Sequence, residues 1–171
     1  MSIIYRNIKL IISDIDGVLT NGTKGYNNTG KGIVKFFSDK DFTAIKLFQK
    51  NKIFFCLLSA DKNINLNLCK DRNFHFFFGR NSKGEIIKEI IIKKIMKKYK
   101  ISNNNTCYIG DDIFDIAPAK LVKYRACPIN AVRELKKICN IQLNTKGGDG
   151  VIKEFFDRVF KNKKNIIFPV I

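Results

Sequence analysis

The sequence lacks several residue types and patterns that common classes of protein depend on. Its 171 residues include no tryptophan, one histidine, three prolines and only 15 acidic residues against 32 lysines and arginines. The five cysteines are odd in number and form no CxxC pair, which favours reduced thiols in the core of a cytoplasmic protein. No apolar run approaches the roughly 18 residues of a membrane-spanning helix, and the N-terminus has no signal-type hydrophobic segment. These absences predict a soluble, cytoplasmic protein with no membrane association.

The shortage of acids leaves a formal net charge of +17, which would suit a nucleic acid or another anionic surface. The lysines, however, are scattered along predicted helices without interleaved aromatic residues, as in Lys88, Lys93, Lys94, Lys97 and Lys98. We therefore expect solvated helix faces and no nucleic-acid partner, although the charge would also attract a phosphorylated anion. A non-catalytic binding module for a nucleic acid or a protein is the alternative from another functional class.

Short apolar runs alternate with segments of helical periodicity along the whole chain. Strands are expected at residues 8–12, 53–58, 74–78, 106–109 and 123–127, and the main helices at 39–52, 61–72, 82–100 and 151–160. This alternation predicts the α/β class, as a single three-layer Rossmann-like domain whose mostly parallel sheet has helices on both faces.

Two further segments complete the predicted organisation. A stretch rich in Gly and Asn at about residues 21–36 predicts a β-hairpin flap, and a chain of this length leaves no room for a separate cap domain. We place the domain at residues 1–162 and a C-terminal tail at 163–171. The apolar end of that tail would pack against its own core or dock on a neighbouring subunit.

Four polar clusters fall at the carboxyl ends of predicted strands or at the helix starts just beyond them. They are Asp14 with Asp16, Ser59, Lys83, and Asp111 with Asp112 and Asp115. Ligands of parallel sheets bind at this edge, so we expect the clusters to converge there. Taken alone, Asp14 and Asp16 could also be solvated acids of a turn at the end of a strand.

The residue types in the four clusters suit phosphate chemistry. Several acids around one point would hold Mg²⁺, and a hydroxyl and a lysine beside them would bind phosphoryl oxygens. Asp14 could attack phosphorus to form an aspartyl-phosphate, while Asp16 could protonate the leaving oxygen and then activate water. The pattern therefore predicts an enzyme that hydrolyses a phosphate monoester.

The motifs DIDGVLT, LLS, Lys83 and GDDIFD resemble, in order and spacing, those of the haloacid dehalogenase superfamily of phosphatases. The resemblance implies that Asp14 is the nucleophile, that Asp16 is the acid/base, and that Ser59 and Lys83 bind the phosphoryl group. It also implies a Mg²⁺ site made by Asp14, Asp111 and the main-chain carbonyl of Asp16. Asp112 would support the metal site and Asp115 would brace the loop.

Within that superfamily, the chain is similar to the capless group that includes the 3-deoxy-D-manno-octulosonate 8-phosphate phosphatases. The flap and the segments FFSDKD, FFGRNSK and KGGDGVIKEF carry this similarity. It implies a phosphatase of a phosphorylated keto-sugar acid in lipopolysaccharide biosynthesis. It further implies a homotetramer in which the flap and tail of one subunit help to close another subunit's pocket.

One departure from the group's pattern bears on the substrate. After the second strand the octulosonate enzymes typically read TGR, whereas this chain reads Ser59, Ala60 and Asp61, so an acid stands where an arginine is usual. Phosphatases of nine-carbon keto acid 9-phosphates, of the KDN or N-acetylneuraminate type, can carry an acid there. They are therefore the alternative, with Arg72 as a possible partner of Asp61. Arg80 would either touch the substrate or belong to a solvated loop.

Overall fold

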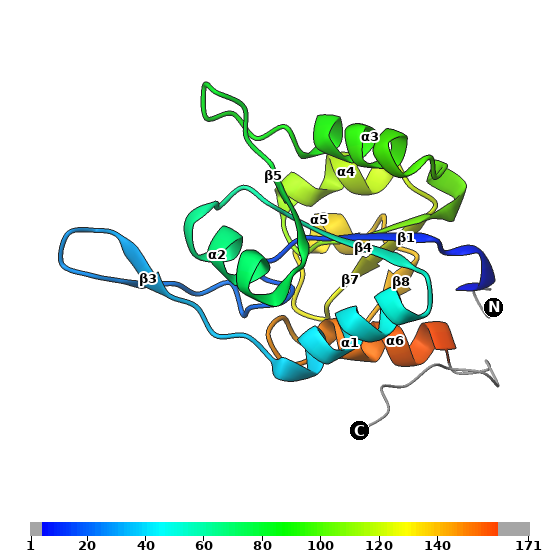
Figure 1. Cartoon of the computed structure of the whole chain (residues 1–171), viewed down its shortest axis with the longest axis horizontal. Coiled ribbons are helices and arrows are strands. Elements are labelled where there is room, and N and C mark those ends of the chain that lie inside the picture. Colours follow the sequence, from blue (N-terminus) through cyan, green and yellow to red (C-terminus); the bar gives the residue numbers. More distant parts are fainter. Residues whose placement is uncertain (1–4, 161–171) are drawn as a thin grey trace.

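The computed structural model describes residues 5–160, which form a twisted parallel sheet between two layers of helices (Figure 1). The sheet has six strands in the order β5-β4-β1-β6-β7-β8, and every pairing is parallel. In chain order the strands are β1 (Leu10–Ser13), β4 (Phe54–Ser59), β5 (His75–Phe78), β6 (Thr106–Ile109), β7 (Tyr124–Cys127) and β8 (Ile141–Gln142). The predicted α/β class and three-layer architecture are confirmed. The expected domain boundary after residue 162 and the tail 163–171 lie outside the described residues.

The central strand β1 determines where the candidate site forms. All four of its residues are buried, because helices cover both faces of the sheet. In the parallel register, Ser13 pairs with Leu57 of β4 and with Ile109 of β6. The residues that follow these three strands therefore emerge side by side at one edge of the sheet.

One helical layer consists of α1 (Asp39–Lys50) and α6 (Val151–Phe160), which lie next to each other below the sheet in Figure 1. Phe48 of α1 packs edge-on against Phe156, with the ring centroids 5.1 Å apart. The buried Asp41 connects the two helices, because it accepts hydrogen bonds from the backbone amides of Ile152 and Lys153 at 2.9 and 3.0 Å. Burial raises the pKa of Asp41 to about 6, and these two hydrogen bonds oppose that rise.

The opposite face is covered by α3 (Lys88–Tyr99), α4 (Ile116–Lys120) and α5 (Arg133–Lys136), which bury Ile92, Ile95 and Leu135 with the strands. Helix α2 (Asn63–Arg72) follows β4, and its Cys69 joins the core on the α1 side. Short 3-10 turns at Tyr5–Asn7, Asn103–Asn105 and Ile113–Asp115 complete the described elements. None of the helices within residues 5–160 is long and apolar enough to cross a membrane.

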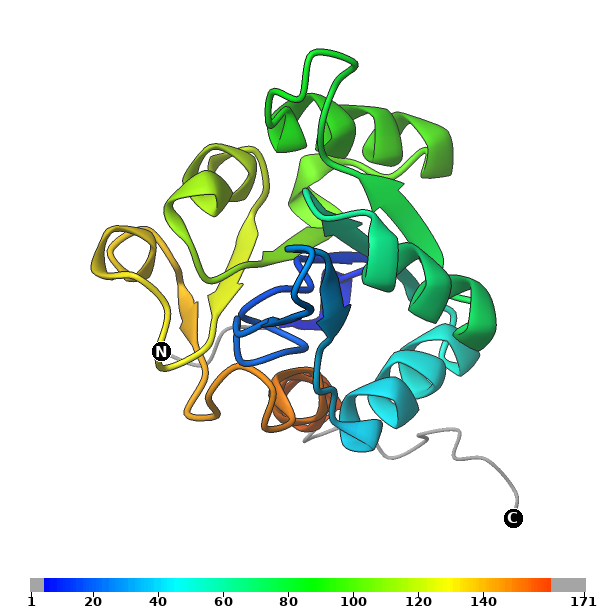
Figure 2. The ribbon, with the colours of Figure 1, turned by 90° about the vertical axis from the view of Figure 1, so that its left-hand side faces the viewer.

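The predicted flap is a β-hairpin formed by β2 (Gly25–Tyr26) and β3 (Gly32–Val34). It projects beyond the sheet on the left of Figure 1, and it faces the viewer in Figure 2. Its turn is closed by the Gly30 amide, which donates to the Asn27 carbonyl at 3.0 Å. The residues that the structure describes contain no second domain, in agreement with the expected absence of a cap.

The start of α3 differs from the prediction. We expected a helix from residue 82, but residues 79–87 form a loop in which Arg80 and Ile86 make an antiparallel bridge. The helix begins only at Lys88. Because of this six-residue difference, Lys88 and not Lys83 is the lysine at the start of the helix.

Candidate functional site

A pocket of about 330 Å³ opens at the carboxyl edge of the sheet, where β1, β4 and β6 end. Its walls come from the loop between β1 and β2, the loops after β4, β5 and β6, and the start of α3. The polar residues that line it are Asp14, Asp16, Lys24, Ser59, Asp61, Arg80, Lys88, Asp111 and Asp112. Side chains far apart in the sequence thus meet in one cavity.

The loop after β1 turns sharply, and it depends on glycines at two separate places in the chain. Gly17 has a φ of +89°, and a β-carbon there would overlap with the Asp111 carboxylate. Gly147 lies against this loop from below, where a β-carbon would overlap with the Gly17 carbonyl. The Gly148 amide also donates to the Val18 carbonyl at 3.0 Å. The segment before α6 therefore supports the loop that carries Asp14 and Asp16.

Lys88 lies between two buried carboxylates at the floor of the pocket. Its Nζ donates to Asp14 Oδ2 at 2.5 Å and to Asp115 Oδ1 at 2.7 Å. Burial alone would lower the pKa of Lys88, but attraction to the two carboxylates outweighs burial and raises it. Lys88 is therefore a fixed positive charge beside Asp14.

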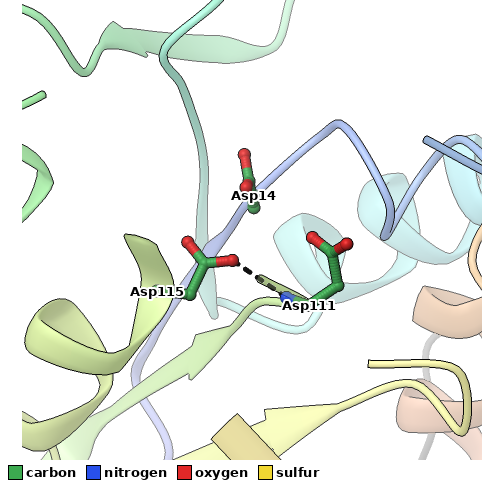
Figure 3. A group of neighbouring side chains, drawn as sticks. All are labelled: Asp14, Asp111 and Asp115. Carbon is green, nitrogen blue, oxygen red and sulfur yellow. Dashed lines mark hydrogen bonds between the residues drawn. The ribbon is translucent and has the colours of Figure 1, made fainter. Parts of the chain in front are cut away.

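Asp115 is fully occupied by hydrogen bonds. Its Oδ1 accepts from Lys88 and from the Tyr108 hydroxyl at 2.6 Å, while its Oδ2 accepts from the backbone amides of Asp111 and Asp112 at 2.9 and 3.1 Å. Figure 3 shows the bond to Asp111 and the arrangement of the three carboxylates. Asp115 thus shapes the loop after β6 and orients Lys88.

Asp14 and Asp111 have the properties of cation ligands. Ligand oxygens of Asp14, Asp111 and Asp115 lie within 4.8 Å of one another, and the buried Oδ1 of Asp111 has no hydrogen-bond partner among the described residues. Burial, followed by repulsion from Asp115, raises the pKa of Asp14 well above its usual range. Burial and the neighbouring carboxylates raise the pKa of Asp111 to about 7. A hard divalent cation would relieve this repulsion, so the residues fit Mg²⁺.

The Asp16 carboxylate accepts hydrogen bonds from a different set of residues. Its Oδ1 accepts from Lys35 Nζ at 2.5 Å, and its Oδ2 accepts from Ser59 Oγ at 3.0 Å and from Asn65 Nδ2 at 2.9 Å. The side chains of Asp14 and Asp16 therefore have different surroundings, although one residue separates them.

The structure brings most of the predicted site residues together. Asp14, Asp16, Ser59, Asp111 and Asp112 line the pocket with the specificity candidates Asp61 and Arg80, and Asp115 lies buried beneath them. Asp61 Oδ2 accepts from Lys24 at 2.6 Å and from Lys35 at 2.8 Å. Burial would raise the pKa of Asp61, but these lysines lower it overall. Arg80 donates to the backbone carbonyls of Ala60 and Gly84.

Two predicted positions do not reach the pocket. Lys83 is exposed in the loop before α3, and Lys88 occupies the position beside Asp14 that we assigned to Lys83. The prediction was wrong because the helix begins later than its periodicity suggested. Arg72 lies at the end of α2, with its guanidinium over the Phe42 ring and 3.6 Å from Asp39, so it does not meet Asp61.

The sequence contained a signal for two of the residues that we missed. Lys88 lies on the same helix face as the buried Ile92 and Ile95, and Asn65 lies one turn before the buried Cys69. A polar residue on an apolar helix face needs a buried partner, so the pattern indicates that Lys88 and Asn65 each have one. Lys35 had no comparable signal among the 32 basic residues.

Comparisons with known proteins agree with this geometry. A family model for haloacid dehalogenase-like hydrolases matches residues 76–155. A 3-deoxy-D-manno-octulosonate 8-phosphate phosphatase, KdsC, from Haemophilus influenzae is 31% identical over 91% of this chain and 84% of its own length. The chain belongs to the haloacid dehalogenase-like hydrolases.

Other members of this family extend the similarity. KdsC of Escherichia coli strain K12 is 26% identical over 89% of this chain and 79% of its own length. The cobalt-bound phosphatase from Haemophilus influenzae superposes with a TM-score of 0.84, at 30% identity, over 92% of this chain and 90% of that one. The Moraxella catarrhalis enzyme, in complex with magnesium ion, phosphate ion and KDO, shares the fold with a TM-score of 0.83 at 22% identity, over 95% and 93% of the two chains.

Proposed function

We propose that this haloacid dehalogenase-like hydrolase removes phosphate from a phosphorylated keto-sugar acid, 3-deoxy-D-manno-octulosonate 8-phosphate. The observation that carries the proposal is the fixed contact between Lys88 and Asp14 in a pocket that Asp16, Ser59 and Asp111 also line. A cation beside a buried carboxylate provides both a binding site for phosphoryl oxygens and a nucleophile. Two relatives that match 91% and 89% of this chain are named for this substrate.

In the proposed reaction, Asp14 attacks phosphorus and forms an aspartyl-phosphate as the bond to the sugar oxygen breaks. Asp16 donates a proton to that sugar oxygen and then accepts one from the water that hydrolyses the intermediate. Lys88 takes the phosphoryl-binding role together with Ser59. Asp115 and Asp112 support the loop after β6, because the Asp115 carboxylate accepts hydrogen bonds from the backbone amides of Asp111 and Asp112.

Mg²⁺ is the cofactor that the site fits. Asp14, Asp111 and the main-chain carbonyl of Asp16 would hold the ion, while Asp115 is already occupied by four hydrogen bonds. When bound, Mg²⁺ supplies positive charge that neutralises the phosphoryl oxygens and the adjacent carboxylates.

The direct test is phosphate release from octulosonate 8-phosphate, measured in Mg²⁺ and again after chelation. We expect turnover by the wild type, and none by Asp14→Asn or by the chelated enzyme. Activity that survives both treatments would refute the mechanism. No turnover of any phosphate ester, together with salt-sensitive binding to unrelated DNA duplexes, would instead favour the binding-module alternative.

Asp61 supports a second candidate substrate, the 9-phosphate of a nine-carbon keto acid. This acid lines the pocket where octulosonate enzymes typically have an arginine, but both Lys24 and Lys35 already bind it. Comparison of kcat/KM on the eight-carbon and nine-carbon phosphates distinguishes the two candidates. Asp61→Asn is the better probe of this position, because Asp61→Arg would place three cations together and lower activity on both substrates.

We also propose that the enzyme is a cytoplasmic homotetramer of lipopolysaccharide biosynthesis. Exposed apolar residues on and beside the hairpin, Tyr26, Val34 and Phe36, support an intersubunit contact, and all five cysteines are free. Light scattering at several concentrations tests the assembly. A monomer at all concentrations would contradict the tetramer and leave the phosphatase proposal intact.

A further inference from the structure

We propose that Lys35, supplied by the hairpin, is a positioning residue that holds Asp16 in the orientation needed to protonate the leaving sugar oxygen. This inference rests on the proposed function, since it concerns one step of that reaction. It assigns a role in catalysis to the residue that directly follows β3 (Gly32–Val34).

The first argument is the burial of Lys35. Its side chain is 0% exposed, although the hairpin that carries it projects from the body of the domain. Lysine is almost never fully buried unless its charge is paired, because desolvation of an ammonium group is costly. The position therefore requires specific partners.

Those partners all belong to the site. Lys35 Nζ donates to Asp16 Oδ1 at 2.5 Å, to Asp61 Oδ2 at 2.8 Å and to Asn65 Oδ1 at 3.0 Å. An ammonium group has three protons, so each proton has one acceptor. Lys35 consequently has no free donor for the substrate, and it acts through the residues that it contacts.

The second argument is the way in which Asp16 is held. Ser59 and Asn65 both donate to Oδ2, whereas Lys35 is the one donor to Oδ1 among the contacts that the structure records. Two points of attachment fix the rotation of a carboxylate, and one does not. Loss of the Lys35 ammonium would leave Asp16 free to turn about its remaining contacts.

The effect of losing Lys35 on the rate of hydrolysis depends on the leaving group of the phosphate ester. As phosphorus bonds to the Asp14 oxygen, the bond to the sugar oxygen breaks and that oxygen takes the proton of Asp16. A sugar alkoxide is strongly basic and needs this proton, whereas a nitrophenolate is stable without it. A misplaced general acid slows the first ester by about 10²-fold or more and leaves the second nearly unchanged.

The experiment compares kcat/KM of Lys35→Met with that of the wild type on octulosonate 8-phosphate and on p-nitrophenyl phosphate. This parameter reports the steps up to phosphoryl transfer, so hydrolysis of the intermediate does not enter. We expect a loss of about 100-fold on the sugar phosphate and less than about 5-fold on the aryl phosphate. Equal losses on both esters would overturn the proposal, because a purely structural role lowers both together.

Three further variants keep the result interpretable. Lys31→Met changes an exposed lysine of the same hairpin and should match the wild type on both esters. Lys35→Arg keeps the charge and should recover part of the sugar-phosphate activity. Lys35→Met combined with Asp61→Asn removes one of the two carboxylates that Lys35 pairs, and it replaces the single variant if that variant unfolds, with Asp61→Asn alone as its reference.

The activity of the wild type shows whether a failure concerns the role of Lys35 or the proposed substrate. If the wild type fails on octulosonate 8-phosphate but hydrolyses another alkyl phosphate, the substrate assignment is wrong, and the comparison of alkyl and aryl esters still tests Lys35. If the wild type hydrolyses no ester, both proposals are overturned.

Discussion

Lys88 Nζ lies 2.5 Å from Asp14 Oδ2, across a separation of 74 residues in the sequence. The contact is nearly inaccessible to solvent, with side-chain exposures of 5% and 7%. It forms because β1 ends beside the first turn of α3. The proposed chemistry depends on this pair.

The first prediction distinguishes Lys88 from Lys83. Lys88→Met should lower kcat/KM for phosphate release by about 10²–10³-fold, because it removes the charge beside the phosphoryl group. It should also destabilise the protein by about 3–5 kcal/mol, since Asp14 and Asp115 are left buried without a cation.

Lys83→Met is the matched control, and it should change neither activity nor stability measurably because Lys83 is exposed. Steady-state kinetics and urea unfolding measure both effects. A large loss of activity in Lys83→Met would show that the loop before α3 closes over the substrate in a way that this structure does not contain.

The second prediction concerns the contact of Gly147 with the loop that carries Asp14 and Asp16. Gly147→Ala introduces a β-carbon that overlaps with the Gly17 carbonyl, so the loop must shift. We expect about 1–3 kcal/mol of destabilisation and at least a tenfold loss of kcat/KM.

Gly30→Ala serves as the control for this second prediction. Gly30 has a φ of +75° in the hairpin turn, and a β-carbon there meets no atom within 4 Å. Its cost should be only the backbone strain of about 1–2 kcal/mol, with kcat/KM unchanged. If Gly147→Ala retained full activity, the loop would not depend on this support.

The third prediction concerns the cation. At 100 times its dissociation constant, Mg²⁺ should stabilise the wild type by about 2.7 kcal/mol, which raises the melting temperature by roughly 5–10 °C. Asp111→Asn should lose this response because it removes a ligand charge. Asp71→Asn, on the exposed end of α2, should keep it. Thermal denaturation in MgCl₂ and in chelator provides the measurement, and an equal shift in Asp111→Asn would exclude Asp111 as a ligand.

The fourth prediction concerns pH and the buried Asp41. Its pKa is raised from 3.8 to about 6, so the folded state binds more protons than the unfolded state between these values. The contribution of Asp41 to stability therefore falls as pH rises through that window, by about 2–3 kcal/mol in total.

Asp41→Asn should remove this dependence while keeping an oxygen that accepts from Ile152 and Lys153. Urea unfolding at pH 4 and at pH 7 should give a wild-type free energy of unfolding that exceeds the variant's by more at pH 4. The other titrating groups are common to both proteins and cancel in the difference. A difference independent of pH would refute the assignment.

The sequence predicted the site residues correctly where a local pattern of apolar and polar residues determines their place in the sheet. Asp14 and Asp111 each follow a short apolar run that ends abruptly, and parallel strands bring such ends to one edge. The same reasoning located Ser59 at the end of β4. The three-layer arrangement followed from the alternation of strands with helices, and the glycine-rich hairpin followed from its turn residues.

Prediction was incomplete where tertiary contacts determine the result. The loop before α3 has helical periodicity, yet Arg80 and Ile86 form a bridge around a turn in which Gly84 has a φ of +83° and the Asn81 side chain accepts from the Lys83 and Glu85 amides. The periodicity outweighed this local turn signal in the prediction. Lys35 is buried by partners 19 to 30 residues away, which composition cannot reveal. Arg72 was placed near Asp61 by spacing alone, whereas Phe42 and Asp39 attract its guanidinium elsewhere.

Because Gly147 packs against Gly17, the loop that carries Asp14 depends on a residue that is synthesised much later. Asp14, the proposed nucleophile, lies near the beginning of the chain, but Gly147, which packs against its loop, is synthesised about 130 residues later, just before α6. A nascent chain can form β1 and its neighbours early, yet we expect the loop that carries Asp14 to reach its final conformation only after residue 147 has left the ribosome. We therefore expect no activity from a nascent chain that ends before Gly147.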